Sequence, residues 1–142
     1  VLLGVTSSVV YKNWNFNFVV RGNFGNHMYN NVFSNTGTFR TNSLNFLSNV
    51  SRNYLETGFG NNQYFSDYYI EDASFLRMDQ ASLGYDFGKV FQDKANLRAT
   101  FNVQNVFVLT KYRGLDPEIA GGIDNNFYPR PRVFSLGINL DF

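Results

Sequence analysis

The clearest pattern along the chain is an alternation of apolar and polar residues with a period of two, which indicates β-strands that are apolar on one face. The end of the chain shows it best, because every second residue of 134–142 is apolar: Phe134, Leu136, Ile138, Leu140 and Phe142. The same alternation predicts strands over 3–11, 14–21, 75–87 and 97–104. It weakens around 77–80, which predicts a β-bulge or a projection beyond the apolar layer. Helical periodicity is nearly absent, so we predict an all-β fold of about five antiparallel strands.

The predicted connections are of two kinds. Lys12 and Asn13 form a tight turn and 88–94 a short one, whereas 25–66 and 108–131 are long and rich in Asn, Gly and Tyr. An antiparallel order then places both short turns at one end of the sheet and both long loops at the other. Two architectures fit: a soluble sandwich with an aromatic core, or an outer-membrane barrel whose aromatic face meets lipid. Aromatic residues beside the short turns favour the barrel, because such rings settle at membrane interfaces: Tyr11, Trp14, Tyr85 and Phe87.

Composition narrows the function classes. The 142 residues carry a net charge of +1, so there is no electrostatic reason to expect a nucleic-acid partner. An aromatic share of 18% excludes a disordered tail. The chain has no cysteine, hence no disulfide, and its apolar runs are far shorter than the ~18 residues of a spanning helix. It opens inside an apolar stretch without an initiator Met, so we expect a piece of a longer protein.

Candidate chemistry is sparse, and we expect no enzyme activity, no metal and no cofactor. His27 is the single histidine and lacks a ligand cluster, so we expect a plain loop residue. Glu71 and Asp72 are adjacent on a predicted strand and point to opposite faces, so they cannot converge as a glycosidase pair. We expect solvated charges there, with an ion pair to Arg77.

Other loop motifs give weak signals. Asp116, Glu118 and Asp124 offer hard oxygen ligands without the spacing of an EF-hand. We expect loop hydrogen bonding at these residues, with a bound calcium ion as the alternative. The Gly-Phe-Gly of 58–60 lacks the Lys-Ser/Thr of a phosphate loop and predicts a flexible turn.

Two further sets of residues bear on the barrel interpretation. The terminal pattern resembles the signal by which outer-membrane barrels are recognised for insertion: Ser135, Gly137, Leu140 and Phe142. The alternative is an ordinary edge strand, which would expose an apolar edge. The polar faces of the predicted strands supply candidate lumen-facing residues: Arg21, Arg98, Asn102, Gln104 and Asn139. The alternative is that these side chains only hydrogen-bond to one another and to water.

Three stretches, 69–88, 97–119 and 122–142, resemble the closing strands of SusC/RagA-like TonB-dependent outer-membrane transporters. The specific elements include Asp72-Ala73-Ser74 with Leu76-Arg77, Leu83-Gly84-Tyr85, Gln104-Asn105, Thr110-Lys111-Tyr112 leading to Asp116-Pro117-Glu118, and Tyr128-Pro129 with Pro131-Arg132. The stretch 11–30 is similar in a looser way. The resemblance implies the C-terminal wall of a barrel of about 22 strands with a plugged lumen. Five strands cannot close such a wall, and the plug and the TonB-engaging segment are not in this sequence.

The resemblance also implies a function and partners. It implies uptake of oligosaccharides or peptides across the bacterial outer membrane, with a SusD-like surface lipoprotein as lid and TonB acting through the N-terminal region. The expected partners are therefore the remaining barrel and plug, the lipoprotein, TonB and lipid. The long loops supply the candidates for lid or substrate contact, some as exposed aromatic rings: Tyr64, Tyr68, Tyr69, Asp116 and Tyr128. The alternative for the aromatic rings is packing of the loop upon itself. A soluble carbohydrate-binding sandwich and a carbohydrate-active enzyme are the alternatives.

Overall fold

The computed structural model describes residues 1–38, 50–92, 94–125 and 128–142, and these form two compact units. The sheet unit comprises 1–24, 75–110 and 130–142, and the loop unit comprises 25–74 and 111–129. Within the described residues no helix has the length and apolar character needed to cross a bilayer.

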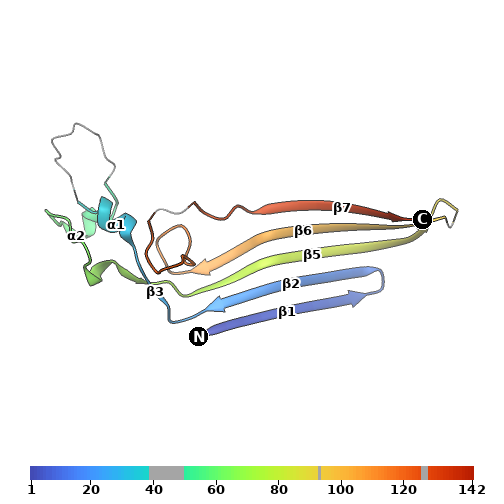
Figure 1. The fold of residues 1–142 in the computed structure, drawn as a ribbon, viewed down its shortest axis with the longest axis horizontal. Helices are drawn as coiled ribbons and strands as arrows, with labels where there is room; N and C mark the ends of the chain where they lie inside the picture. The colour runs from blue at the N-terminus through green and yellow to red at the C-terminus, as the bar shows by residue number, and fades with distance from the viewer. Residues whose placement is uncertain (39–49, 93, 126–127) are drawn as a thin grey trace. The chain divides into compact units, whose positions relative to one another are not determined.

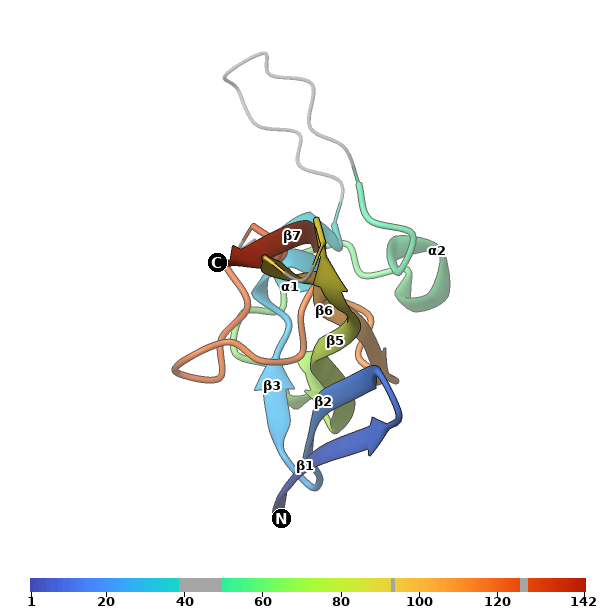
Figure 2. The ribbon, with the colours of Figure 1, turned by 90° about the vertical axis from the view of Figure 1, so that its right-hand side faces the viewer.

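Five antiparallel strands make up the sheet unit (Figure 1). They are β1 (Leu2–Tyr11), β2 (Trp14–Asn23), β5 (Phe75–Val90), β6 (Ala95–Thr110) and β7 (Val133–Asp141), in the sheet order β1-β2-β5-β6-β7. Figure 2, seen from the end with the short turns, shows the strands following one another in this order. The β1–β2 and β5–β6 turns lie at one end, and the strands meet the long connections at the other (Figure 1). The predicted all-β class and turn arrangement are confirmed.

Strand register separates the side chains into two faces, because directly paired residues of antiparallel strands point to the same side. One row across all five strands is apolar: Val9, Phe16, Leu83, Phe101 and Leu136. The adjacent row is polar: Ser8, Asn17, Ser82, Asn102 and Ser135. We call these the apolar face and the polar face.

The apolar face is accessible rather than covered. Phe101 is 43% exposed, Phe134 62% and Ile138 65%. In a sandwich these side chains would be the closed core, so that interpretation is wrong for the described chain. The sheet instead presents a large apolar surface outward, and such surfaces mark sites of association with protein or membrane.

The weak alternation at 77–80 has a structural cause. Between Met78 and Gln80 the register of β5 shifts against β6, and β2 shifts against the same stretch. Against β2, Asp79 is therefore the extra residue of a β-bulge, as the sequence predicts, whereas β6 places two residues, Asn105 and Val106, opposite Asp79. Opposite it on β6, Asn105 has a φ of 52°, a left-handed conformation that asparagine tolerates better than most residues.

Two predicted boundaries are wrong. The 88–94 stretch is only partly turn, because β5 continues to Val90 and β6 begins at Ala95. The second long loop begins after Thr110 rather than at 108. In both cases the strands stay paired beyond the last residues that alternate between apolar and polar. At the first boundary the register also shifts, between Asp86 and Gly88.

The loop unit holds short elements that alternation does not predict. It contains β3 (His27–Tyr29), α1 (Asn31–Thr36), α2 (Tyr54–Thr57), the 3₁₀-helix η1 (Asp67–Tyr69) and β4 (Ile70–Asp72). β3 pairs with β4, and Met28, Ala73 and Tyr112 form a small buried core with Ile119 packed against it. The Asn30 side chain caps α1 by accepting a hydrogen bond from the Phe33 amide at 3.0 Å. Gly58 takes the left-handed conformation that ends α2, so the turn predicted at 58–60 is a helix cap.

Candidate functional site on the polar face and in the loop unit

The candidate lumen-facing residues share one face of the sheet. Arg21 on β2 pairs with Arg77 on β5, and Arg98 on β6 pairs with Asn139 on β7. Asn102 and Gln104 follow at alternate positions of β6. Strand register thus brings together all five residues selected from the sequence for this face.

At the end of the sheet away from the short turns, the polar face is a network of charged and amide groups. The Arg21 guanidinium forms an ion pair with Asp79, with Nη2 donating to Oδ1 at 3.0 Å. Arg77 is 2% exposed, and its Nη1 donates to Asn105 Oδ1 at 3.1 Å. Asn105 Nδ2 in turn donates to the Arg130 carbonyl at 2.7 Å. The bulge explains this ion pair, because it turns Asp79 toward Arg21. The sequence did not predict Asp79 as the partner of Arg21.

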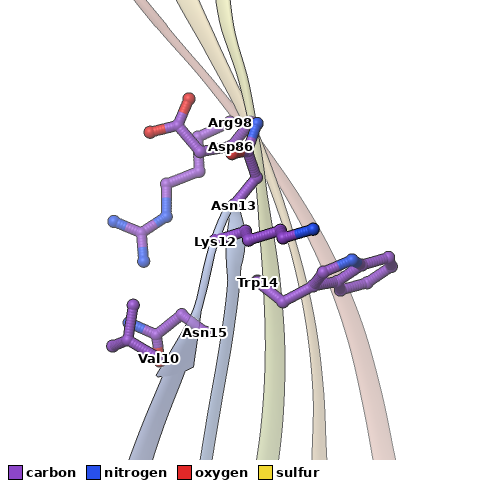
Figure 3. A pocket seen from close by; sticks show the side chains of 8 residues that line it. Val10, Lys12, Asn13, Trp14, Asn15, Asp86 and Arg98 are labelled. Atoms are coloured by element: carbon purple, nitrogen blue, oxygen red, sulfur yellow. The ribbon is translucent and has the colours of Figure 1, made fainter.

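Near the short turns the polar face is hollowed by a shallow pocket of about 190 Å³ (Figure 3). Its lining comes from β1, the β1–β2 turn, β2, β5 and β6: Val10, Lys12, Asn13, Trp14, Asn15, Gly84, Asp86 and Arg98. Two backbone-linked bonds tie the turn to β5: Asn13 Nδ2 donates to the Asp86 carbonyl, and the Asp86 amide donates to the Asn13 carbonyl. The pocket walls are therefore fixed by the sheet itself.

In the loop unit, Glu71 is bound by several donors. Arg113 donates to it from Nε at 3.1 Å, from Nη2 at 2.9 Å and from its backbone amide at 3.2 Å, and Asn30 Nδ2 donates at 3.1 Å. The hydrogen bonds from Arg113 to Glu71 raise the pKa of the guanidinium. The expected ion pair of Glu71 or Asp72 with Arg77 is wrong. Asp72 instead accepts from the Ser74 side chain and amide, which lowers the pKa of the Asp72 carboxyl.

The acidic residues after β6 serve the fold of the loop unit. Asp116 Oδ1 accepts from the Glu118 amide at 2.9 Å, and Asp124 Oδ2 accepts from the buried Tyr112 hydroxyl at 2.7 Å. Burial, then the bond to Asp124, raises the pKa of Tyr112 strongly. The described residues contain no group of three or more His, Cys, Asp or Glu that would hold a metal ion. The loop hydrogen bonding expected at Asp116 and Asp124 is present.

The candidate contact residues of the loops are not equally accessible. Tyr128 is 90% exposed, and Tyr64 and Tyr68 are also exposed. The expectation of an exposed Tyr69 is wrong: its ring is fully buried and packs edge-on against Tyr29 and Tyr68. Asp116 is buried as well. Packing of the loop on itself therefore accounts for Tyr69 and Asp116, and leaves three exposed tyrosines as surface groups.

The four residues of the terminal pattern divide between the faces. Ser135 and Gly137 lie opposite Asn102 and Thr100 on the polar face. Leu140 lies opposite Leu97 on the apolar face, and the highly exposed Phe142 follows the last residue of β7. Their use as an insertion signal stays a prediction.

The sequence and the fold of this chain are similar to those of known TonB-dependent receptors and of a peptide importer. The TonB-dependent receptor SusC of Bacteroides thetaiotaomicron is 41% identical over 150 aligned residues, which include all of this chain and 15% of the receptor. TonB-dependent receptor P3 of Formosa agariphila is 26% identical over 160 residues, covering 99% of this chain and 16% of that receptor. A solved structure of the RagAB peptide importer in the open-open state matches with a TM-score of 0.75 at 23% identity, over 99% of this chain and 17% of that one. No family model matches the chain.

This chain is a SusC/RagA-like segment. The structural match fixes the fold: the five-stranded sheet of the SusC/RagA-like segment is a partial sheet of the kind found in TonB-dependent transporter barrels. The segment spans about a sixth of the length of the relatives it matches. By name these relatives are receptors and a peptide importer rather than enzymes.

Proposed function

We propose that the SusC/RagA-like segment is the C-terminal wall of an outer-membrane transporter that takes up oligosaccharides or peptides in a TonB-dependent manner. The observation that carries the proposal is the division of the sheet into an accessible apolar face and an opposite polar face. In a transmembrane barrel the apolar face meets hydrocarbon and the polar face lines an aqueous interior. The likeness to SusC and to the RagAB peptide importer supports transport as the function.

A surface lipoprotein of the SusD kind is the proposed partner of the loop unit. In outer-membrane barrels short turns face the periplasm and long connections face the exterior. That topology assigns 25–74 and 111–129 to the outer side, where a lid would dock. Tyr64, Tyr68 and Tyr128 are the proposed contact residues, because exposed tyrosines carry a large apolar ring with a polar tip. Tyr69 and Asp116 are not proposed as contact residues, because both side chains are buried.

Deletion of the gene for the complete receptor tests the transport proposal. The deletion strain and the same strain carrying the gene in trans are grown on single oligosaccharides and on defined peptides as sole carbon or nitrogen source. We expect a growth defect on one of these classes and its rescue by the restored gene. Growth equal to the parent on every member of both panels, with the receptor absent from the outer membrane, would overturn the proposal.

Co-purification tests the partner. The receptor is extracted in mild detergent and isolated by an affinity tag placed outside the segment. We expect a lipoprotein to accompany it, and the alanine variant of Tyr128 to retain less of it. Recovery of the receptor without any lipoprotein would contradict the proposed lid.

A further inference from the structure

The shallow pocket near the short turns holds an arginine, Arg98, that forms no ion pair with the residues the structure describes. Among the described residues, the Arg98 guanidinium has no ion-pair or hydrogen-bond partner. The other two arginines of the polar face differ in this respect, since Arg21 pairs with Asp79 and Arg77 donates to Asn105. Among the strand arginines of the polar face, Arg98 is therefore the one that is available to an outside group.

The nearest acidic neighbour of Arg98 along the sheet is occupied elsewhere. Asp86 is its direct cross-strand partner, yet its Oδ1 accepts a hydrogen bond from the Gly88 amide at 2.7 Å. Figure 3 shows the Asp86 carboxylate and the Arg98 guanidinium pointing in different directions, with Arg98 extending toward Val10 and Asn15. The two residues are paired in the register, but the bulge that follows Asp86 lets the Gly88 amide bind the Asp86 carboxylate.

Gly84 provides the space in which Arg98 lies. A Cβ placed on Gly84 would come 3.5 Å from Arg98 Nη2 and 3.7 Å from Nε, so the guanidinium rests against a side-chain-free stretch of β5. Asn15 lies opposite Gly84 in the register and also lines the pocket. Asn15 Oδ1 accepts from Asn17 Nδ2 at 2.7 Å, which leaves the Asn15 amide nitrogen as a second donor. A fork of guanidinium donors beside an amide donor matches the two oxygens of a carboxylate.

We propose that this pocket binds the carboxylate of an Asp or Glu from a part of the receptor outside residues 1–142. This inference rests on the proposed function, in which the polar face lines the lumen. The segment covers 15% of SusC, so most of such a receptor is available to supply the partner. Outer-membrane transporter barrels of about 22 strands have a plugged lumen, so lumen-facing cations there meet protein as well as water. The contact anchors that part of the receptor to the wall at the end of the sheet with the short turns.

A zero-length cross-link identifies the partner directly. The complete receptor carrying Arg98→Lys keeps a cation in the pocket and offers a primary amine. A carbodiimide activates a nearby carboxylate, the amine displaces the activating group as a urea, and an amide bond forms with loss of water overall. Digestion and mass spectrometry then name both peptides. We expect a pair that joins the peptide containing position 98 to an Asp or Glu outside 1–142.

A matched control places the same amine elsewhere on the same strand and face. Asn102 lies four positions along β6 and is outside the pocket, so we expect loss of the cross-linked pair in Asn102→Lys. Formation of the pair with equal yield at position 102 would overturn the proposal. Cross-linking of position 98 to Asp86, to the lipoprotein or to nothing, in a receptor that reaches the outer membrane, would also overturn it. The orientation of the sheet is tested separately by lipid quenching, so failure of the pocket and failure of the proposed function give different results.

Discussion

The sheet unit and the loop unit differ in how they use part of their aromatic side chains. In the sheet, Phe101, Phe134 and Leu136 remain accessible on the apolar face. In the loop unit, Tyr69 and Tyr112 are buried, and most buried side chains of the described chain lie there. The loop unit therefore builds a core of its own, whereas the sheet depends on surroundings outside this chain to cover its aromatic face. Aromatic side chains thus face the surroundings of the chain in the sheet unit and pack against one another inside the loop unit.

The largest expected effect comes from placing a charge on the apolar face. Arg at position 138, near the middle of β7, is expected to cost about 2–4 kcal/mol if that position faces the bilayer midplane. Ile138→Arg should therefore lower the amount of folded receptor in the outer membrane, measured by heat-modifiable gel mobility and surface protease resistance. Ser135→Arg is the control, because Ser135 lies on the polar face of the same strand, opposite the neutral Asn102. Equal losses in both variants would remove the distinction between the faces.

The loop unit should respond to the loss of an internal ion pair. Glu71 is largely buried and accepts four hydrogen bonds from Arg113 and Asn30. Glu71→Gln keeps its shape but removes the charge, and should cost about 1.5–3 kcal/mol in local stability. Hydrogen exchange of the intact receptor should accelerate in β3 and β4 and stay unchanged in β5 and β6. Faster exchange across the sheet would show that the two units are not independent.

A smaller effect is expected from the buried hydroxyl of Tyr112. Tyr112→Phe removes the bond to Asp124 and should cost about 1 kcal/mol in the loop unit. Because the folded-state pKa of Tyr112 is raised, its contribution is complete below the unfolded pKa of about 10 and is lost as pH rises above it. Hydrogen exchange or thermal unfolding from pH 8 to 11 should show an alkaline loss that the variant reduces. An identical pH profile would contradict this assignment.

The smallest effect on stability is expected at Tyr128. Its ring is 90% exposed, so Tyr128→Ala should change stability by less than about 0.5 kcal/mol. Lipoprotein retention should nevertheless fall, and Tyr11→Ala, on the other unit, should leave retention unchanged. Retention that is unaffected by Tyr128→Ala would remove this residue from the lid contact.

How far the sequence predicts each unit follows from what holds it together. Successive side chains of a strand point to opposite faces, so an apolar–polar alternation predicts both the strand and its faces. The five strands were predicted in this way, with Phe134 on the apolar face and Asn102 on the polar face. The loop unit depends on single contacts, such as the Asn30 cap and the Glu71–Arg113 pair, between residues far apart in the chain. The alternation of apolar and polar residues does not predict such contacts. The exposure of Tyr69 and the ion-pair partner of Glu71 were therefore predicted wrongly. The Arg98 pocket likewise involves a contact that alternation does not predict, the hydrogen bond from the Gly88 amide to Asp86.

The central claim is that the apolar face meets lipid and the polar face meets water, and fluorescence quenching tests it most directly. The chain has no cysteine, so any cysteines elsewhere in the receptor are replaced and a single one is introduced by Leu136→Cys or Ser135→Cys. Each variant is labelled with the same fluorophore and reconstituted into bilayers whose acyl chains carry nitroxides. We predict strong quenching at position 136 and weak quenching at 135, with water-soluble iodide giving the reverse. Equal quenching by the lipid at both positions, or stronger quenching at 135, would contradict the account.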